Sequence, residues 1–168
     1  MSVIDRYLEN NALYAQDFRG PLPLPPSSHV AVVACMDARL DVYRILGLKP
    51  GEAHVIRNAG GIIDDAAIRS LAISQRLLGT REIILIHHTD CGMLTFTDDQ
   101  LRRQIAEDVG FPPSFAFGSF PDLDEEVRGS IRRLQNDHFL VHRDSVRGFV
   151  FDVKTGRLRE VVTTPVEA

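Results

Sequence analysis

Two short segments of the chain concentrate side chains that bind metals or take part in acid–base chemistry. In the first, an apolar run is followed by a thiol, a carboxylate and a guanidinium, from Cys35, Asp37 and Arg39. In the second, another apolar run ends in the imidazole of His88 and the thiol of Cys91. Two thiolates and one imidazole form a known catalytic zinc set, in which a fourth position stays open for water. The chain has only two cysteines, so no third cysteine closes such a site.

Other chemistries of cysteine fit this spacing less well. A thiol redox protein would be expected to carry Cys-x-x-Cys, which the sequence lacks. A phosphatase-like or sulfur-transfer nucleophile at Cys35 would need a longer, glycine-rich loop before its arginine. Two inert buried thiols are the plainest alternative, but their place in one combined motif favours metal binding.

Asp37 and Arg39 are suited to control such a metal. A carboxylate held by a guanidinium accepts a hydrogen bond from zinc-bound hydroxide and aims its remaining lone pair at an electrophile. Without Arg39, Asp37 could itself bind the zinc, which makes it a conditional fourth ligand in a closed state. The alternative is a structural ion pair that caps the following helix.

For the two segments to meet, both must lie at the carboxyl edge of one parallel sheet. The apolar runs at 29–35 and 82–87, with a shorter one at 53–56, are typical of strands covered on both faces. Ile68, Leu71, Ala72 and Leu78 recur at helical spacing, so a helix is expected there, capped by Asp64 or Asp65 and ended by Gly79. Strands that alternate with helices predict an α/β fold with a mostly parallel central sheet and flanking helices.

The rest of the chain extends this pattern. We expect a detached N-terminal helix, a stiff proline-rich connector and a phenylalanine-rich loop that serves as core or interface. A hairpin is expected near the end of the chain. The corresponding ranges are 3–18 for the first helix, 20–28 for the connector, 97–109 and 122–134 for later helices, 110–121 for the loop, and 146–153 with 158–162 for the hairpin.

Length and composition favour one domain, 1–168, with an arm and connector at 1–28 and an α/β core at 29–168. The formal net charge of -4 disfavours binding to nucleic acid or to an anionic membrane. No early apolar run approaches the roughly 18 residues that a membrane span needs, and the first residues lack the layout of a signal peptide. We therefore expect a cytoplasmic protein.

Together, Cys35-x-Asp37-x-Arg39 and His88-x-x-Cys91 resemble the signature of the β-class carbonic anhydrases. The resemblance implies that Cys35, His88 and Cys91 bind Zn²⁺ and that Asp37 and Arg39 form a catalytic dyad. It implies a lyase that reversibly hydrates carbon dioxide to bicarbonate and a proton, by attack of zinc-bound hydroxide.

The resemblance is clear over about 29–94 and looser to about 162. It implies an antiparallel edge strand on the parallel sheet and an N-terminal helical arm that packs on a neighbouring subunit of a homodimer or homotetramer. The turn that contains Gly60 could contact the substrate anion through backbone donors. Members regulated by bicarbonate carry a Trp where this chain has Val32, which argues against that form of regulation.

Two rival functions keep the same ligands. A related zinc hydrolase of carbonyl sulfide or carbon disulfide would attack a similar linear, apolar electrophile. A non-catalytic module that binds zinc or carbon dioxide would not need the dyad, which is present here. His87 is expected to point away from the ligands, because neighbouring residues of a strand face opposite sides.

Overall fold

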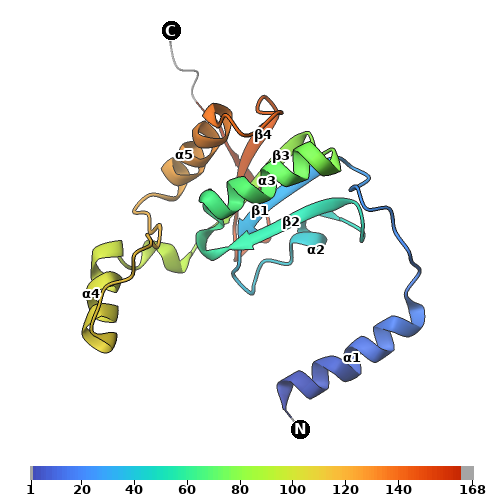
Figure 1. Ribbon diagram of the computed structural model, residues 1–168, viewed down its shortest axis with the longest axis horizontal. Coiled ribbons are helices and arrows are strands. Elements are labelled where there is room, and N and C mark those ends of the chain that lie inside the picture. Colours follow the sequence, from blue (N-terminus) through green and yellow to red (C-terminus); the bar gives the residue numbers. More distant parts are fainter. Residues whose placement is uncertain (1, 164–168) are drawn as a thin grey trace.

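A computed structural model describes residues 2–163 of the chain (Figure 1). Met1 and residues 164–168 lie outside the described residues. The expected domain at 1–168 includes all of them, and its expected core at 29–168 includes the last five. In chain order the elements are α1 (Val3–Asp17), β1 (Val30–Cys35), α2 (Val42–Leu46), β2 (Ala53–Asn58), the 3₁₀ turn η1 (Ala59–Gly61), α3 (Asp65–Leu78), β3 (Glu82–His88), the 3₁₀ turn η2 (Gly92–Leu94), α4 (Asp98–Val109), α5 (Leu123–Asn136), β4 (Val146–Phe151) and β5 (Leu158–Val161).

The five strands form one sheet in the order β2-β1-β3-β4-β5. The first four strands run parallel, and β5 pairs antiparallel with β4. This confirms the expected mostly parallel sheet with an antiparallel edge strand. Ala34 of β1 lies opposite Ile86 of β3, so the two segments that follow these strands leave the sheet at the same edge.

β2 is longer than the expected 53–56, because its parallel pairing with β1 continues until Asn58 lies opposite Cys35. β3 likewise extends to His88, which pairs with Phe151 of β4. Both extensions carry regular backbone up to the edge where the polar segments begin. The ligand-bearing residues Cys35 and His88 therefore end strands and do not lie on free loops.

Both faces of the sheet are buried, which explains the nearly continuous apolar strands. Ala31 and Val33 of β1 pack in a cluster with residues of α3 and α5, whereas Val32 and Ala34 pack in a second cluster with residues of α2. α3 and α5 thus cover one face of the parallel core (Figure 1), whereas the short helix α2 and loop residues such as Met93 and Phe120 cover the other. Such packing fixes the register of the strands and the position of their carboxyl ends.

Side-chain caps set the helix boundaries. The Asp64 carboxylate accepts a hydrogen bond from the backbone of α3 at 2.7 Å, and Gly79 ends that helix in a left-handed conformation with φ 76°. Thr97 caps α4, and Asp122 caps α5. These helices begin and end close to where the sequence predicts, because short polar caps and a terminal glycine satisfy otherwise unpaired backbone groups.

α1 stands apart from the sheet at the end of the extended connector (Figure 1). All of its residues are exposed, including the large apolar side chains of Ile4, Tyr7 and Leu8. A capping box between Ser2 and Asp5 stabilises its first turn. The expected N-terminal helix is confirmed, and its packing on a neighbouring subunit stays a prediction. No helix within residues 2–163 combines the length and the apolar character needed to cross a membrane.

The phenylalanine-rich loop follows α4 and is divided between core and surface. Phe120 is buried against the sheet, as expected for a core residue, whereas Phe111 and Phe115 are exposed. Arg102 of α4 donates hydrogen bonds to the backbone carbonyls of Pro113 and Phe115, which ties the loop to the helix. That the exposed part of the loop forms an interface stays a prediction.

Candidate metal centre

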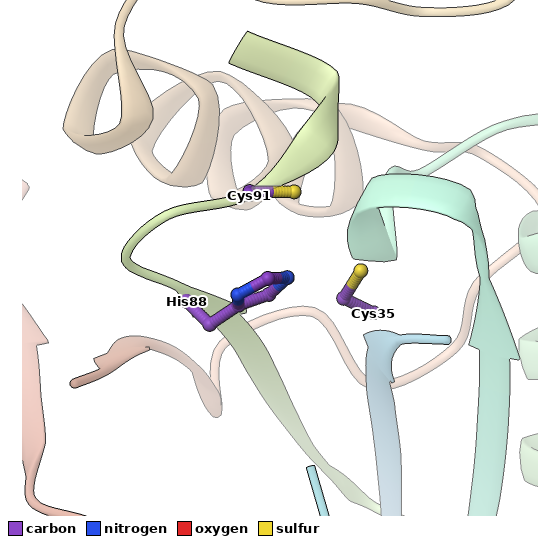
Figure 2. A group of neighbouring side chains, drawn as sticks. All are labelled: Cys35, His88 and Cys91. Carbon is purple, nitrogen blue, oxygen red and sulfur yellow. The ribbon is translucent and has the colours of Figure 1, made fainter. Parts of the chain in front are cut away.

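Three potential ligands converge at the carboxyl edge of the sheet, as Figure 2 shows. Cys35 is the last residue of β1, His88 is the last residue of β3, and Cys91 follows the turn after β3. One ligand atom from each lies within 4.8 Å of the other two, and all three residues are buried. Within residues 2–163 this is the one group of three or more such side chains that the structure brings together.

Hydrogen bonds to the end of β4 and to the residues just after it hold the turn between His88 and Cys91 in place. The backbone N–H of Thr89 donates to the carbonyl of Phe151 at 2.9 Å, and the Thr89 hydroxyl accepts from the backbone N–H of Val153 at 3.1 Å. Asp90 takes a left-handed conformation with φ 56°, which Asp adopts more readily than most residues. These constraints bring His88 and Cys91 to one side of the turn.

The His88 ring is oriented for metal binding. Nδ1 lies 2.9 Å from the backbone carbonyl of Thr89, so this nitrogen carries the proton and donates it. Nε2 is buried and finds no hydrogen-bond partner among the described residues. A buried acceptor without a partner is costly, and a metal ion between the ring and the two thiols would satisfy it.

The two thiols are electrostatically coupled. The neighbouring Cys91 thiol, as a hydrogen-bond donor, lowers the pKa of Cys35 against the opposing effect of burial. The same contact, together with burial, raises the pKa of Cys91 well above its usual range. Burial opposes a charge on His88, but the adjacent Cys35 thiolate outweighs it and raises the pKa of that imidazole. Cys35 is thus poised as a thiolate, the form that binds metals.

The donor set fits zinc. Two sulfurs and one imidazole nitrogen match the borderline-soft character of Zn²⁺. With Cys35, His88 and Cys91 as the only described members of the group, the set has the three protein ligands of a catalytic site and lacks the fourth of a structural one. The residues present therefore suit a catalytic zinc ion.

Asp37 lies beside this cluster and is gripped by Arg39. Arg39 Nε donates to Asp37 Oδ1 at 2.9 Å, and Nη2 donates to Oδ2 at 2.8 Å. These hydrogen bonds hold the pKa of Asp37 well below its usual range, and the same contact raises the pKa of Arg39. Asp37 Oδ2 is 3.7 Å from His88 Nε2, so the ionised carboxylate faces the ligand cluster.

Two contributions were missed by sequence reasoning. Arg57 of β2 donates to the backbone carbonyls of Cys35 and Asp37, and thereby holds the segment that carries a ligand and the carboxylate. Asp90 contacts Arg39 through both its carboxylate and its backbone carbonyl. The sequence gives no signal for the contacts of Arg57, because its acceptors are backbone groups.

A cavity of about 330 Å³ opens beside the cluster. Asp37 and the three ligands share its wall with Gly60 and with mostly apolar side chains, namely Met36, Ala59, Met93 and Phe96. Gly60 has φ 80°, and a Cβ there would approach Met93 to 3.0 Å, which explains the need for glycine. A small apolar molecule would be accommodated next to the ligands and the carboxylate.

His87 is not part of the cluster. Its ring is 1% exposed and packs edge-on against Phe120, with the two ring centroids 5.9 Å apart. Burial lowers the pKa of His87 to about 4, so the ring is neutral. Alternation along β3 places it on the side of Ile83 and Leu85, away from His88, as the sequence predicts.

Comparison with known proteins agrees with this geometry. A family model described as carbonic anhydrase matches residues 30–109. The chain is 64% identical to β-carbonic anhydrase 1 of Mycobacterium tuberculosis, over 96% of this chain and 99% of that protein. A carbon disulfide hydrolase of Acidianus is 31% identical, over 94% of this chain and 90% of that protein. A crystal structure of carbonic anhydrase from Streptococcus mutans superposes with a TM-score of 0.90 at 43% identity, over 96% of this chain and 99% of that chain.

Proposed function

Since the chain belongs to the β-class carbonic anhydrase family, we propose that it is a zinc-dependent lyase that reversibly hydrates carbon dioxide to bicarbonate and a proton. The observation that carries this proposal is the buried Cys35–His88–Cys91 cluster, which lies beside an ionised carboxylate in the wall of a small, mostly apolar cavity. Carbon dioxide is small, linear and apolar, and it suits such a cavity.

In this proposal Cys35, His88 and Cys91 hold the zinc ion. Zinc, when bound, supplies Lewis-acid chemistry that lets water act as a nucleophile near neutral pH. The apolar residues of the cavity wall keep bulk water from surrounding the substrate, which strengthens the electrostatic contacts inside. Gly60 lies on this wall, and we propose it as a contact for the substrate.

Asp37 would orient the attacking water. Its Oδ1 accepts from two donors of Arg39, whereas Oδ2, the oxygen nearest His88, accepts from Nη2 alone among the described residues. Oδ2 therefore keeps a lone pair for a hydrogen bond from the water. Because its pKa lies well below the usual range, Asp37 stays ionised and acts as an acceptor. If the grip of Arg39 is lost, the same oxygen becomes the conditional fourth zinc ligand.

We also propose that the protein is a homodimer or homotetramer. α1 exposes a set of large apolar side chains that it does not bury against its own sheet. A helix with that surface gains most of its stability by packing on another surface, and a second copy of this chain is the partner proposed here. The arm at 1–28 and the core at 29–168 would then belong to one domain that exchanges its arm. The free thiols of the site favour a reducing compartment such as the cytoplasm.

The alternative reaction is hydrolysis of carbon disulfide or carbonyl sulfide. This alternative is supported by one observation: carbon disulfide hydrolases align with most of this chain at about one-third identity. The identity to the mycobacterial carbonic anhydrase is twice as high, which favours carbon dioxide.

One zinc-loaded sample tests these alternatives. Its metal content is measured by mass spectrometry, its hydration of carbon dioxide by stopped flow, and its release of sulfide from carbonyl sulfide and carbon disulfide in parallel. Near-stoichiometric zinc with fast hydration is the expected result. Sulfide release without hydration would establish the hydrolase, and zinc without either activity would leave a binding module. Cys91→Ala serves as the control that loses zinc.

A further inference from the structure

Asp90 holds a second edge of the Arg39 guanidinium. Nη1 of Arg39 donates to Asp90 Oδ2 at 2.7 Å, and Nη2 donates to the Asp90 backbone carbonyl at 3.0 Å. The remaining contacts of the guanidinium, from Nε and Nη2, go to Asp37. We propose that Asp90 is a positioning residue that keeps Arg39 in the orientation in which it restrains Asp37. This rests on the function proposed above.

The backbone of Asp90 makes this double contact possible. Its φ of 56° lies in the left-handed region, where glycine is the usual residue and Asp is tolerated. The turn that brings His88 and Cys91 together therefore also directs the carbonyl and the carboxylate of Asp90 toward Arg39. Glycine could adopt this turn conformation equally well, so we infer that the Asp90 side chain has a role beyond the turn.

That role is orientation and not folding stability. The Arg39 and Asp90 side chains are 46% and 74% exposed, and an ion pair so open to solvent contributes little to the stability of a protein. The long Arg39 side chain, however, has several rotatable bonds. Without the carboxylate of Asp90, the contacts left to it among residues 2–163 would be those with Asp37 and with one backbone carbonyl.

The position of Asp37 makes this restraint matter. Its Oδ2 is 3.7 Å from His88 Nε2, the buried, unpartnered nitrogen that would bind a metal ion together with the two thiols. A small displacement would bring the carboxylate among the ligands, where it would occupy the position that water needs. Loss of the Asp90 side chain should therefore increase the fraction of molecules in which Asp37 is a ligand.

The test compares Asp90→Gly with Asp90→Asn. The glycine variant suits the backbone and removes the carboxylate, whereas the asparagine variant tolerates the same backbone and keeps an oxygen acceptor. We expect Asp90→Gly to lower kcat for carbon dioxide hydration about tenfold at unchanged KM and zinc content, and Asp90→Asn to recover most of it. Glu160→Gln is the matched control, because it weakens an exposed bidentate pair with Arg147 far from the site, and it should leave kcat unchanged.

A spectroscopic measurement separates positioning from a general structural effect. In the cobalt-substituted protein, Asp90→Gly should show the visible absorption of an added carboxylate ligand, while Asp90→Asn should resemble the parent. In an Arg39→Ala background, Asp90→Gly should cause no further loss of kcat, because both act through one contact.

Three results would overturn the proposal: unchanged kcat and spectrum in Asp90→Gly, a fully additive loss in the double variant, or loss of zinc from both Asp90 variants. The last would show that Asp90 serves the ligand turn itself. A parent protein that binds cobalt but does not hydrate carbon dioxide would refute the proposed reaction, and the cobalt spectra would still decide the role of Asp90.

Discussion

The backbone carbonyl of Cys35 accepts two hydrogen bonds from the Arg57 guanidinium, at 3.0 Å from Nε and 2.8 Å from Nη2. Nη2 also donates to the carbonyl of Asp37 at 2.7 Å. One arginine of β2 therefore holds the segment from Cys35, the last residue of β1, to Asp37. Because a guanidinium is planar and always charged, it fixes both the position and the direction of that segment.

Replacing Arg57 should loosen the metal site. We expect Arg57→Ala to weaken zinc binding about tenfold, as is typical when a group that supports a ligand is removed. Arg57→Lys should not restore it, because one ammonium does not reproduce the fork. Competition with a chromophoric zinc chelator measures the affinity. Arg44→Ala, which removes an arginine with a 90% exposed side chain, is the control, and equal affinities for both alanine variants would contradict the prediction.

Asp37→Asn should separate zinc binding from turnover. The amide has the shape of the carboxylate but carries no charge and presents an NH₂ group to the donors of Arg39. We expect full zinc content and a kcat lowered by more than about tenfold, since the group that we propose orients the reacting water is lost. Stopped-flow hydration and metal analysis on the same preparation decide this. An unchanged kcat would reduce the Asp37–Arg39 pair to a structural contact.

The ligands could be predicted from the sequence because their placement follows from topology. Parallel strands end at one edge, so Cys35 and the pair at the end of β3, His88 and Cys91, had to meet once the sheet was inferred. The supporting contacts could not be predicted in this way. Arg57 acts on backbone carbonyls, and Asp90 contacts Arg39 through a carboxylate and a carbonyl that a positive φ directs, so neither contact leaves a pattern in the sequence. The alternation of strands and helices predicts which ligands meet, whereas the contacts that hold them depend on local backbone geometry.

Asp98 should make the stability of the protein depend on pH. Its carboxylate accepts the side-chain and backbone donors of Ser119 and the backbone N–H groups of Phe117 and Gly118, which lowers its pKa to about 2. A carboxylate with a depressed pKa stabilises the fold above its ordinary value of 3.8, and this contribution is lost as the pH falls toward about 2. Asp98→Asn should therefore cost about 1–2 kcal/mol near neutral pH.

Urea unfolding of the parent and Asp98→Asn at several pH values between about 7 and about 3 measures this difference. The gap between the two free energies of unfolding should narrow as the pH drops below 3.8. The neighbouring Asp99→Asn, which removes an exposed carboxylate from the same helix turn, should show a small gap that changes little. A gap for Asp98→Asn that is constant with pH would mean that ionisation plays no part in holding the loop.

Self-association should depend on the apolar side chains of α1. Leu8 is 65% exposed in the single chain, and a lysine in its place would carry a charge into the contact with a second copy, where it would lose its hydration. We expect Leu8→Lys to weaken self-association at least about tenfold. Sedimentation equilibrium gives the mass as a function of concentration. Asn10→Lys adds the same charge on the same helix and should leave the mass unchanged, so a parent-like mass for Leu8→Lys would exclude this part of α1 from the subunit contact.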